Sequence, residues 1–171
     1  MWLLRVRNRC GYGVHSPFAF RFITDVVYER TPFYAYEALG RSLPWHCQWR
    51  IRRGLELLLR IANYRQPRVI ALDAQVPSLL PWAETYLRAG CSTADVVSLA
   101  EAEQADLVFL SRPDDRAPAL LGERGILILD NLHHHREWFR QLPCTVSFDL
   151  YDLGIAFFHV PYYKQGYKVN F

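Results

Sequence analysis

Three short runs of apolar residues constrain the fold of this chain more than any other feature. They are RVIALDA (68–74), ADLVFLS (105–111) and GILILDN (125–131). Strands that are buried on both faces of a sheet have near-continuous apolar sequences of this kind, whereas half-exposed strands alternate apolar and polar residues. Helical patterns separate the runs, and strands that alternate with helices form a parallel sheet with helices on both faces. The sequence therefore predicts an α/β fold with a mainly parallel sheet.

Residues 47–65 (CQWRIRRGLELLLRIANYR) form the clearest helical pattern. Its apolar positions recur every three or four residues, which places them on one face of a helix. These positions are Ile51, Leu55, Leu58 and Ala62, and the charged positions opposite are Arg52, Arg53, Glu56 and Arg60. We expect the apolar face to pack against the sheet.

The remaining elements follow from weaker patterns. Residues 144–160 fit two strands or one bent strand, and 167–171 fit a last strand. Successive strands at the end of the chain predict an antiparallel hairpin at the edge of the sheet. The other expected elements are a strand at 94–99 and helices at 19–30, 77–90, 114–123 and 134–142.

The length of 171 residues fits one compact domain. Within it we expect an N-terminal helical segment, 1–66, and an α/β core, 67–171. An apolar fraction of 51% and a charged fraction of 22% exclude a disordered chain. No apolar run approaches the roughly 20 residues of a membrane span, and Arg5 interrupts the N-terminal apolar residues too early for a signal peptide. The four scattered cysteines are typical of reduced thiols, so a cytoplasmic protein without membrane contact is expected.

Positive charge is concentrated in the front of the chain. Residues 1–68 contain 12 Arg and 4 acidic residues (12 − 4 = +8), and the remainder contains 8 basic and 13 acidic residues (8 − 13 = −5). A nucleic-acid-binding face around Arg50, Arg52, Arg53 and Arg60 is one interpretation. Docking of the basic segment on the acidic core is the other, and it makes nucleic acid the less expected partner.

Ligands of open α/β sheets bind beyond the carboxyl ends of the strands. The residues at those ends are 73–75, 111–113 and 130–133. His133 is a candidate general base, because the ordinary pKa of imidazole is about 6.5. Three consecutive histidines, 133–135, cannot all face one metal ion from a helix, so we predict no metal site there. The pair Asp130–Asn131 is also typical of a helix N-cap.

Three segments carry a resemblance to a known family. They are GYGVHSPFAFRFITDVVYE near the start, LLLRIANYRQPRVIALD in the middle and SFDLYDLGIAFF near the end. In combination they resemble bacterial class I S-adenosylmethionine-dependent methyltransferase-like proteins, which begin with a GxHSPF segment and end with a DLxxxGxxFF hairpin. The resemblance implies a Rossmann-like class I methyltransferase sheet, mainly parallel with an antiparallel C-terminal hairpin. It also implies S-adenosylmethionine as the cofactor.

The resemblance places the cofactor at the strand ends, with Asp73, Ala74, Ser111 and Asp130 as the cofactor-binding positions. His133 remains the candidate catalytic base on its chemistry. Two departures weaken this site. The glycines of the family's first loop are replaced by Asp73 and Pro77, which adds a Cβ where the backbone would approach the cofactor.

The second departure is one of length. Only 33 residues (106 − 73) separate Asp73 from Asp106, and a strand–helix unit takes about 30 residues, so one unit fits where the family has two. Glu101 is then the candidate for the family's ribose-binding acid. In related metal-dependent enzymes an earlier Asp joins the Asp-Asn pair in binding a cation. Ser111 stands at that position here, and the ligand set is incomplete.

Three functions remain open from the sequence. The first is a degenerate methyltransferase-like protein, or pseudoenzyme, with weak or lost cofactor binding and a partner-binding role. The second is an active S-adenosylmethionine-dependent methyltransferase with an unknown acceptor, and the third is an Arg-rich nucleic-acid-binding module. For the first, we expect a homo-oligomer or a protein partner at the C-terminal aromatic hairpin. The aromatic residues of that hairpin and tail are Phe157, Phe158, Tyr162, Tyr163, Tyr167 and Phe171.

Overall fold

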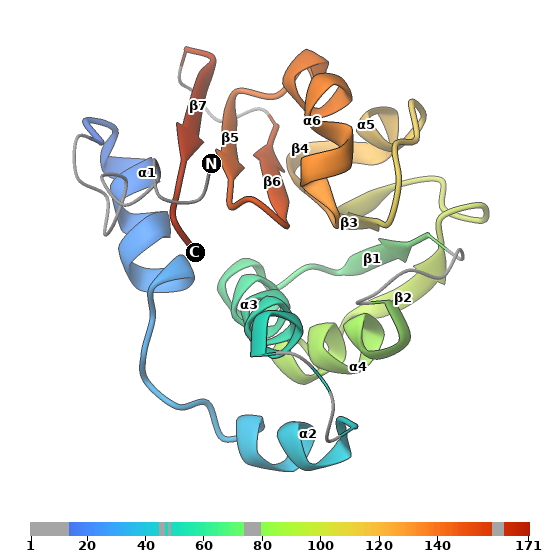
Figure 1. The fold of residues 1–171 in the computed structure, drawn as a ribbon. Coiled ribbons are helices and arrows are strands. Elements are labelled where there is room, and N and C mark those ends of the chain that lie inside the picture. The colour runs from blue at the N-terminus through green and yellow to red at the C-terminus, as the bar shows by residue number, and fades with distance from the viewer. Residues whose placement is uncertain (1–13, 45–46, 48, 74–79, 159–162) are drawn as a thin grey trace.

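One twisted sheet forms the centre of the molecule (Figure 1). The computed structural model describes residues 14–44, 47, 49–73, 80–158 and 163–171. Within these residues seven strands pair in the order β2-β1-β3-β4-β6-β5-β7. Their bounds are β1 (Val69–Leu72), β2 (Asp95–Ser98), β3 (Ala105–Leu110), β4 (Leu121–Leu129), β5 (Val146–Asp149), β6 (Gly154–Phe157) and β7 (Gln165–Lys168).

The strand directions confirm the predicted sheet. Strands β2, β1, β3 and β4 are parallel, and β6 is antiparallel to both of its neighbours, β4 and β5. Among the described residues between β1 and β3 lie one helix and one strand, α4 (Leu80–Gly90) and β2, as the short interval predicts. The expectation of an edge hairpin is wrong in one respect. Strand β7 pairs in parallel with β5 and forms the edge, so the β5–β6 hairpin lies inside the sheet.

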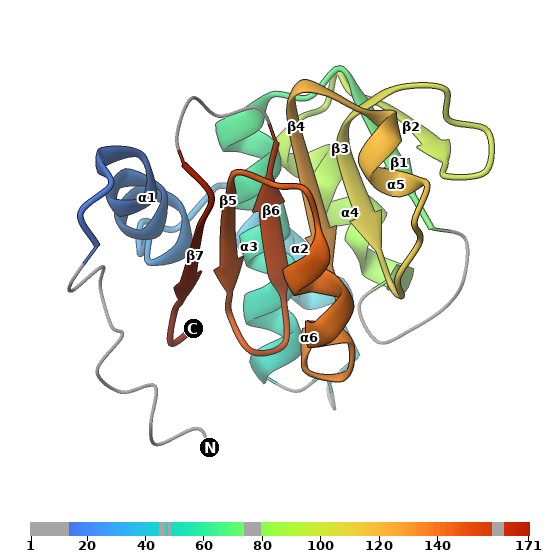
Figure 2. The same ribbon diagram turned by 90° about the horizontal axis from the view of Figure 1, so that it is seen from above.

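Helices cover both faces of the sheet, as Figures 1 and 2 show. One face carries α1 (Pro17–Phe22), the π-helix η2 (Ile23–Val27), α3 (Trp49–Arg65) and α4, whose apolar side chains share a core with Ile70, Phe109 and Ile128. The opposite face carries α5 (Ala117–Leu120) and α6 (Leu132–Gln141) over a smaller core. Helix α5 is shorter than the expected helix 114–123, because the backbone becomes extended at Leu121 and continues into β4.

Helix α3 lies on the sheet through the apolar face that its sequence predicts. Leu55, Leu58 and Ala62 are fully buried in the core beneath the sheet. Helix α4 crosses α3 closely at Gly90, where a Cβ atom would collide with the carbonyl oxygen of Leu59. The sequence places Gly90 at the end of its helix, and close packing is the second reason for a glycine there.

Arg60 corrects the expectation that the charged side of α3 faces solvent. Its side chain is only 7% exposed. The guanidinium donates hydrogen bonds to the carbonyl oxygens of Val26 (2.7 Å) and Val27 (3.2 Å) and to the hydroxyl of Tyr36 (3.0 Å). Since a helix ends with unbonded carbonyl groups, Arg60 stabilises the carboxyl end of η2. Arg60 therefore cannot share one open basic surface with Arg50, Arg52 and Arg53.

The N-terminal segment continues the core of the sheet rather than forming a core of its own. Phe22 and Ile23 are fully buried, and Phe22 packs against Phe148 of β5 and Phe157 of β6. Helix α2 (Tyr36–Ser42) lies in a stretch where the sequence predicts only a connection, and none of its residues is buried. Among the described residues, no helix combines the length and apolar character needed to cross a membrane.

The C-terminal aromatic residues divide into two groups. Phe157 and Phe158 are 5% and 4% exposed, so they belong to the core rather than to the expected partner-binding surface. The reason is that β6 lies between two other strands and both of its faces are covered. Tyr163, by contrast, is 91% exposed, while Tyr162 falls outside the described residues.

Candidate functional site

The carboxyl ends of β1, β3 and β4 meet at one edge of the sheet, as parallel strands require. Asp73 follows β1, Ser111 follows β3 and Asp130 follows β4. The hydroxyl of Ser111 donates a hydrogen bond of 2.5 Å to the Asp73 carboxylate, and the Asp73 amide donates one of 3.1 Å to the Phe109 carbonyl. Two predicted cofactor-binding residues are thus bonded to each other. Ala74, the third, lies outside the described residues.

Asp130 and Asn131 form a second polar group at this edge. The Asp130 side chain is buried, and its carboxylate accepts hydrogen bonds from the Asn131 amide (2.8 Å) and side-chain Nδ2 (3.2 Å). Asn131 occupies the N-cap position of α6 with a φ of 53°, but its side chain does not cap the helix. The pair stands at the start of the helix as predicted, but the side-chain hydrogen bond expected of an N-cap residue is not formed by Asn131. The left-handed backbone turns the Asn131 amide toward Asp130 instead.

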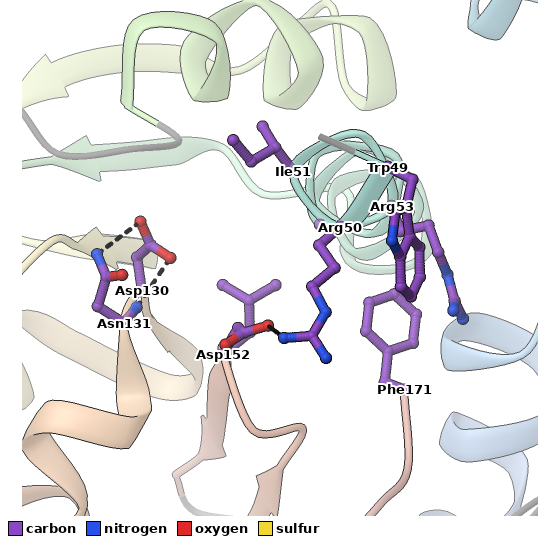
Figure 3. A pocket seen from close by; sticks show the side chains of 10 residues that line it. Trp49, Arg50, Ile51, Arg53, Asp130, Asn131, Asp152 and Phe171 are labelled. Atoms are coloured by element: carbon purple, nitrogen blue, oxygen red, sulfur yellow. Dashed lines mark hydrogen bonds and ion pairs between the residues drawn. The ribbon is translucent and has the colours of Figure 1, made fainter. Parts of the chain in front are cut away.

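Asp130 and Asn131 open into a cavity of about 300 Å³ between α3, the β5–β6 turn and the C-terminal residues. Figure 3 shows its walls. The residues that line it are Trp49, Arg50, Ile51, Arg53, Gly54, Asp130, Asn131, Asp152, Leu153 and Phe171. Of the predicted site residues that the structure describes, Asp130 alone lines it. Asp73 and Ser111 are not among those that line this cavity.

His133, the predicted base, contacts Asp152, which lines the cavity. Its Nδ1 is 3.6 Å from the Asp152 carboxylate, and its ring stacks on Tyr151 with centroids 5.7 Å apart. Burial, followed by the neighbouring His134, lowers the pKa of His133 below its ordinary value. The imidazole is therefore neutral at pH 7 and able to accept a proton, but it does not line the cavity.

Asp152 also forms an ion pair with Arg50 of α3. Its other oxygen lies 3.6 Å from Nη1 of Arg50, which reaches across the cavity toward it (Figure 3). This ion pair connects the basic front of the chain with its acidic remainder, as the charge pattern predicts. Because both side chains are more than 40% exposed, the pair adds at most about 1 kcal/mol of stability.

The sequence did not single out the aromatic side of the cavity. Trp49 and Arg53 come from the first turns of α3, and Phe171 comes from the other end of the chain. The Arg53 guanidinium carbon lies 4.5 Å from the Phe171 ring centroid and 5.5 Å from that of Trp49. A tryptophan and two arginines at helical spacing are the only signal in the sequence, and they do not reveal the contact with Phe171.

Metal ligands are absent from this edge as far as the structure describes it. Across the described ranges, no three His, Cys, Asp or Glu side chains lie together as a metal ion would require. Cys91 and Cys144, both buried, are free thiols.

Comparisons with known proteins place the fold. No family model matches the chain, and no curated protein matches it in sequence. Twelve chains of solved structures match. One is the crystal structure of a methyltransferase from Geobacter sulfurreducens, with a TM-score of 0.50 and 11% sequence identity over 85% of this chain and 98% of that one. An identity this low bears on the fold alone. The chain therefore has a methyltransferase-like, Rossmann-type fold.

Proposed function

We propose that this protein is a degenerate methyltransferase-fold protein that binds S-adenosylmethionine weakly or not at all and acts by binding a partner. The observation that carries the proposal is the hydrogen bond between Ser111 and Asp73 at the carboxyl ends of β3 and β1. These are the positions where the resemblance expects the cofactor. Fold alone does not decide function, so the chemistry of this edge must carry the conclusion.

The residues at this edge do not fit the cofactor. A glycine after β1 would leave room for a ligand against the backbone, whereas Asp73 adds a Cβ and a carboxylate. The methionine part of the cofactor carries a carboxylate of its own, so the Asp73 charge opposes it. The hydrogen bond to Ser111 holds the Asp73 side chain between the two strand ends, which keeps this charge in place.

The length of the chain supports the same conclusion. Strand β2 ends at Ser98 and β3 begins at Ala105, so only a short connection joins them. The second strand–helix unit of the family has no residues in this interval. The edge of the sheet next to β1 is accordingly one strand, β2, rather than two.

A partner-binding role is the second half of the proposal. The burial of Phe157 and Phe158 removes most of the aromatic hairpin as a docking surface. What supports a role for this region is that β7 is the last strand of the sheet among the described residues, with the exposed Tyr163 just before it. A second copy of the chain or another protein would pair there.

Calorimetry tests the cofactor half directly. We expect no saturable heat of binding when S-adenosylhomocysteine or S-adenosylmethionine is titrated up to millimolar concentration into the protein. A dissociation constant in the micromolar range would overturn this half. Sedimentation velocity tests the partner half, since a strictly monomeric protein that co-purifies with nothing contradicts it.

An active S-adenosylmethionine-dependent methyltransferase is the alternative, and one observation favours it. Glu101 is exposed in the turn after β2, at the same edge of the sheet as Asp73, where the family's ribose-binding acid would stand. The Glu101 amide donates to the Ser98 carbonyl, which fixes that turn. If calorimetry detects the cofactor, loss of that binding in Glu101→Gln would support the active enzyme.

A further inference from the structure

The side chain of Asn131 presents a hydrogen-bond acceptor to the cavity beside α3. Its Nδ2 donates a hydrogen bond of 3.2 Å to the Asp130 carboxylate, and this contact fixes which way the carboxamide faces. An ionised carboxylate only accepts, so the amide nitrogen turns toward Asp130 and the amide oxygen turns to the other side. In Figure 3 that oxygen is on the cavity side of the nitrogen.

The Asn131 oxygen has no partner in the part of the chain that the structure describes. The side chain caps no amide of α6, and its only hydrogen bond there is the one that Nδ2 donates. The described side-chain atoms that are buried without a partner are Arg65 Nε and Arg136 Nη2, so Asn131 Oδ1 is not buried. Because Asn131 lines the cavity, an N–H group of a bound molecule would satisfy this acceptor.

The backbone holds the acceptor in place. Asn131 has a φ of 53°, a left-handed conformation that asparagine adopts more readily than most residues. Its amide donates a hydrogen bond of 2.8 Å to Asp130, and its carbonyl accepts one of 2.9 Å from the His134 amide. Bonds on both sides of the residue, together with the Nδ2 contact, keep the oxygen directed as it is.

The charged side chains of the cavity do not call for a charged ligand. Arg50 and Asp152 lie 3.6 Å apart and compensate each other. Asp130 is buried and accepts two hydrogen bonds from Asn131. The Arg53 guanidinium lies beyond the Trp49 and Phe171 rings, away from the cavity (Figure 3). An uncharged molecule therefore suits this lining best.

The rest of the lining is largely apolar. Ile51 projects from α3 toward the Asp130–Asn131 side of the cavity, as Figure 3 shows, and Leu153, Trp49 and Phe171 add further apolar surface. A volume of about 300 Å³ is at the small end of ligand pockets. An aromatic heterocycle combines a flat apolar body with an N–H group in the ring plane, so its faces can lie on these walls while its edge donates to Asn131.

We propose that this cavity binds a small uncharged aromatic heterocycle, which donates a ring N–H to Oδ1 of Asn131 and packs against Ile51 and Leu153. The inference does not rest on the proposed function. It uses neither Asp73 nor Ser111, so it holds whether or not the strand ends bind a cofactor.

Three probes of similar shape test the proposal. Calorimetry of the full chain compares indole with benzofuran, which has an oxygen in place of the N–H group, and with indole-5-carboxylate, which adds a negative charge. We expect indole to bind saturably, with one site per chain, at up to millimolar concentration. Its affinity should exceed that of benzofuran by about three- to tenfold, because one neutral hydrogen bond is lost. Indole-5-carboxylate should not bind more tightly than indole.

Variants locate the site. Asn131→Gly removes the acceptor at a position whose positive φ suits glycine, and it should make the affinities for indole and benzofuran equal. Gln66→Gly is the matched control, because Gln66 also has a positive φ, 49°, and does not line this cavity. It should change neither affinity. Ile51→Ala should weaken both probes alike and keep the ratio between them, since it removes wall and not acceptor.

Four results would overturn the proposal. Two come from the unaltered protein: no saturable binding of indole at millimolar concentration, and equal affinities for indole and benzofuran. The third is an unchanged ratio between the two probes in Asn131→Gly. The fourth is tighter binding of indole-5-carboxylate than of indole, which would identify an anion site instead. A separate titration with S-adenosylhomocysteine reports on the proposed function alone, so the two can fail independently.

Discussion

Replacing Arg60 with methionine should destabilise the protein far more than a change at an ordinary helix surface. Arg60 is 7% exposed and donates hydrogen bonds to the carbonyl oxygens of Val26 and Val27 and to the Tyr36 hydroxyl. Methionine keeps most of the apolar stem but cannot donate. The two carbonyl groups at the end of η2 then lose a charged donor in a buried environment.

The magnitude follows from those bonds. A buried acceptor left without its donor costs about 1–3 kcal/mol, so two carbonyls cost about 2–6 kcal/mol. The removal of a buried guanidinium returns part of this, because its desolvation penalty disappears. We expect a net loss of about 3 kcal/mol in the free energy of unfolding, or about 6–12 °C in Tm for a chain of this size.

Urea denaturation followed by circular dichroism measures the loss, with Arg52→Met as the matched control on the same helix. Arg52 is half exposed and pairs with Glu56 at 2.9 Å, an i,i+4 contact that contributes only about 0.3–0.5 kcal/mol. If the two variants differ by less than about 0.5 kcal/mol, Arg60 does not hold the N-terminal segment to α3 and the reasoning fails.

Two further predictions concern packing and pH. Gly90→Ala should lower the free energy of unfolding by about 2–3 kcal/mol, because the added Cβ collides with the Leu59 carbonyl oxygen. Gly122→Ala is the control: its added Cβ would lie at an ordinary 3.4 Å from the Gln104 side chain, so the change should stay within about 0.5 kcal/mol. Equal urea midpoints for the two variants would refute this prediction. Burial lowers the pKa of both His133 and His135 in the folded protein. As the pH falls through their ordinary pKa of about 6.5, the unfolded chain therefore binds more protons than the folded one. The free energy of unfolding should accordingly fall between about pH 7.5 and pH 5.5. The double replacement of both histidines by glutamine should flatten this fall in midpoints measured across that range, and an unchanged slope would contradict the assignment.

The sheet could be predicted from the sequence because buried strands leave a strong local signal. The runs around 69–72, 105–110 and 125–129 are apolar at nearly every position, and each was placed within a few residues. Helix α2 could not be predicted in the same way. It buries none of its residues, so no apolar face marks it in the sequence.

The position of the hairpin needed more than local pattern. Two strands in succession at the end of the chain predict a hairpin, but not that β7 pairs in parallel beyond β5. That pairing depends on where the chain returns after β6, which short-range residue patterns do not specify. The burial of Phe157 and Phe158 follows instead from the place of β6 between β4 and β5.

The candidate site shows the same limit. Parallel strands bring Asp73, Ser111 and Asp130 to one edge, which general rules for open sheets predict. The hydrogen bond between Asp73 and Ser111 depends on side-chain positions in two separate strands. The contact of Arg53 with Phe171 joins α3 to the C-terminal residue, and only the folded structure reveals it.

The most direct test of lost cofactor binding is a nuclear magnetic resonance titration of the ¹⁵N-labelled protein with S-adenosylhomocysteine. The amide signals of Leu72, Asp73, Ser111 and Asp130 report on the strand ends themselves. We expect no saturable shift of these signals up to millimolar ligand, because the Asp73–Ser111 hydrogen bond occupies the edge. Saturable shifts of the Asp73 and Ser111 signals at micromolar ligand would contradict the proposal and identify a functional cofactor site.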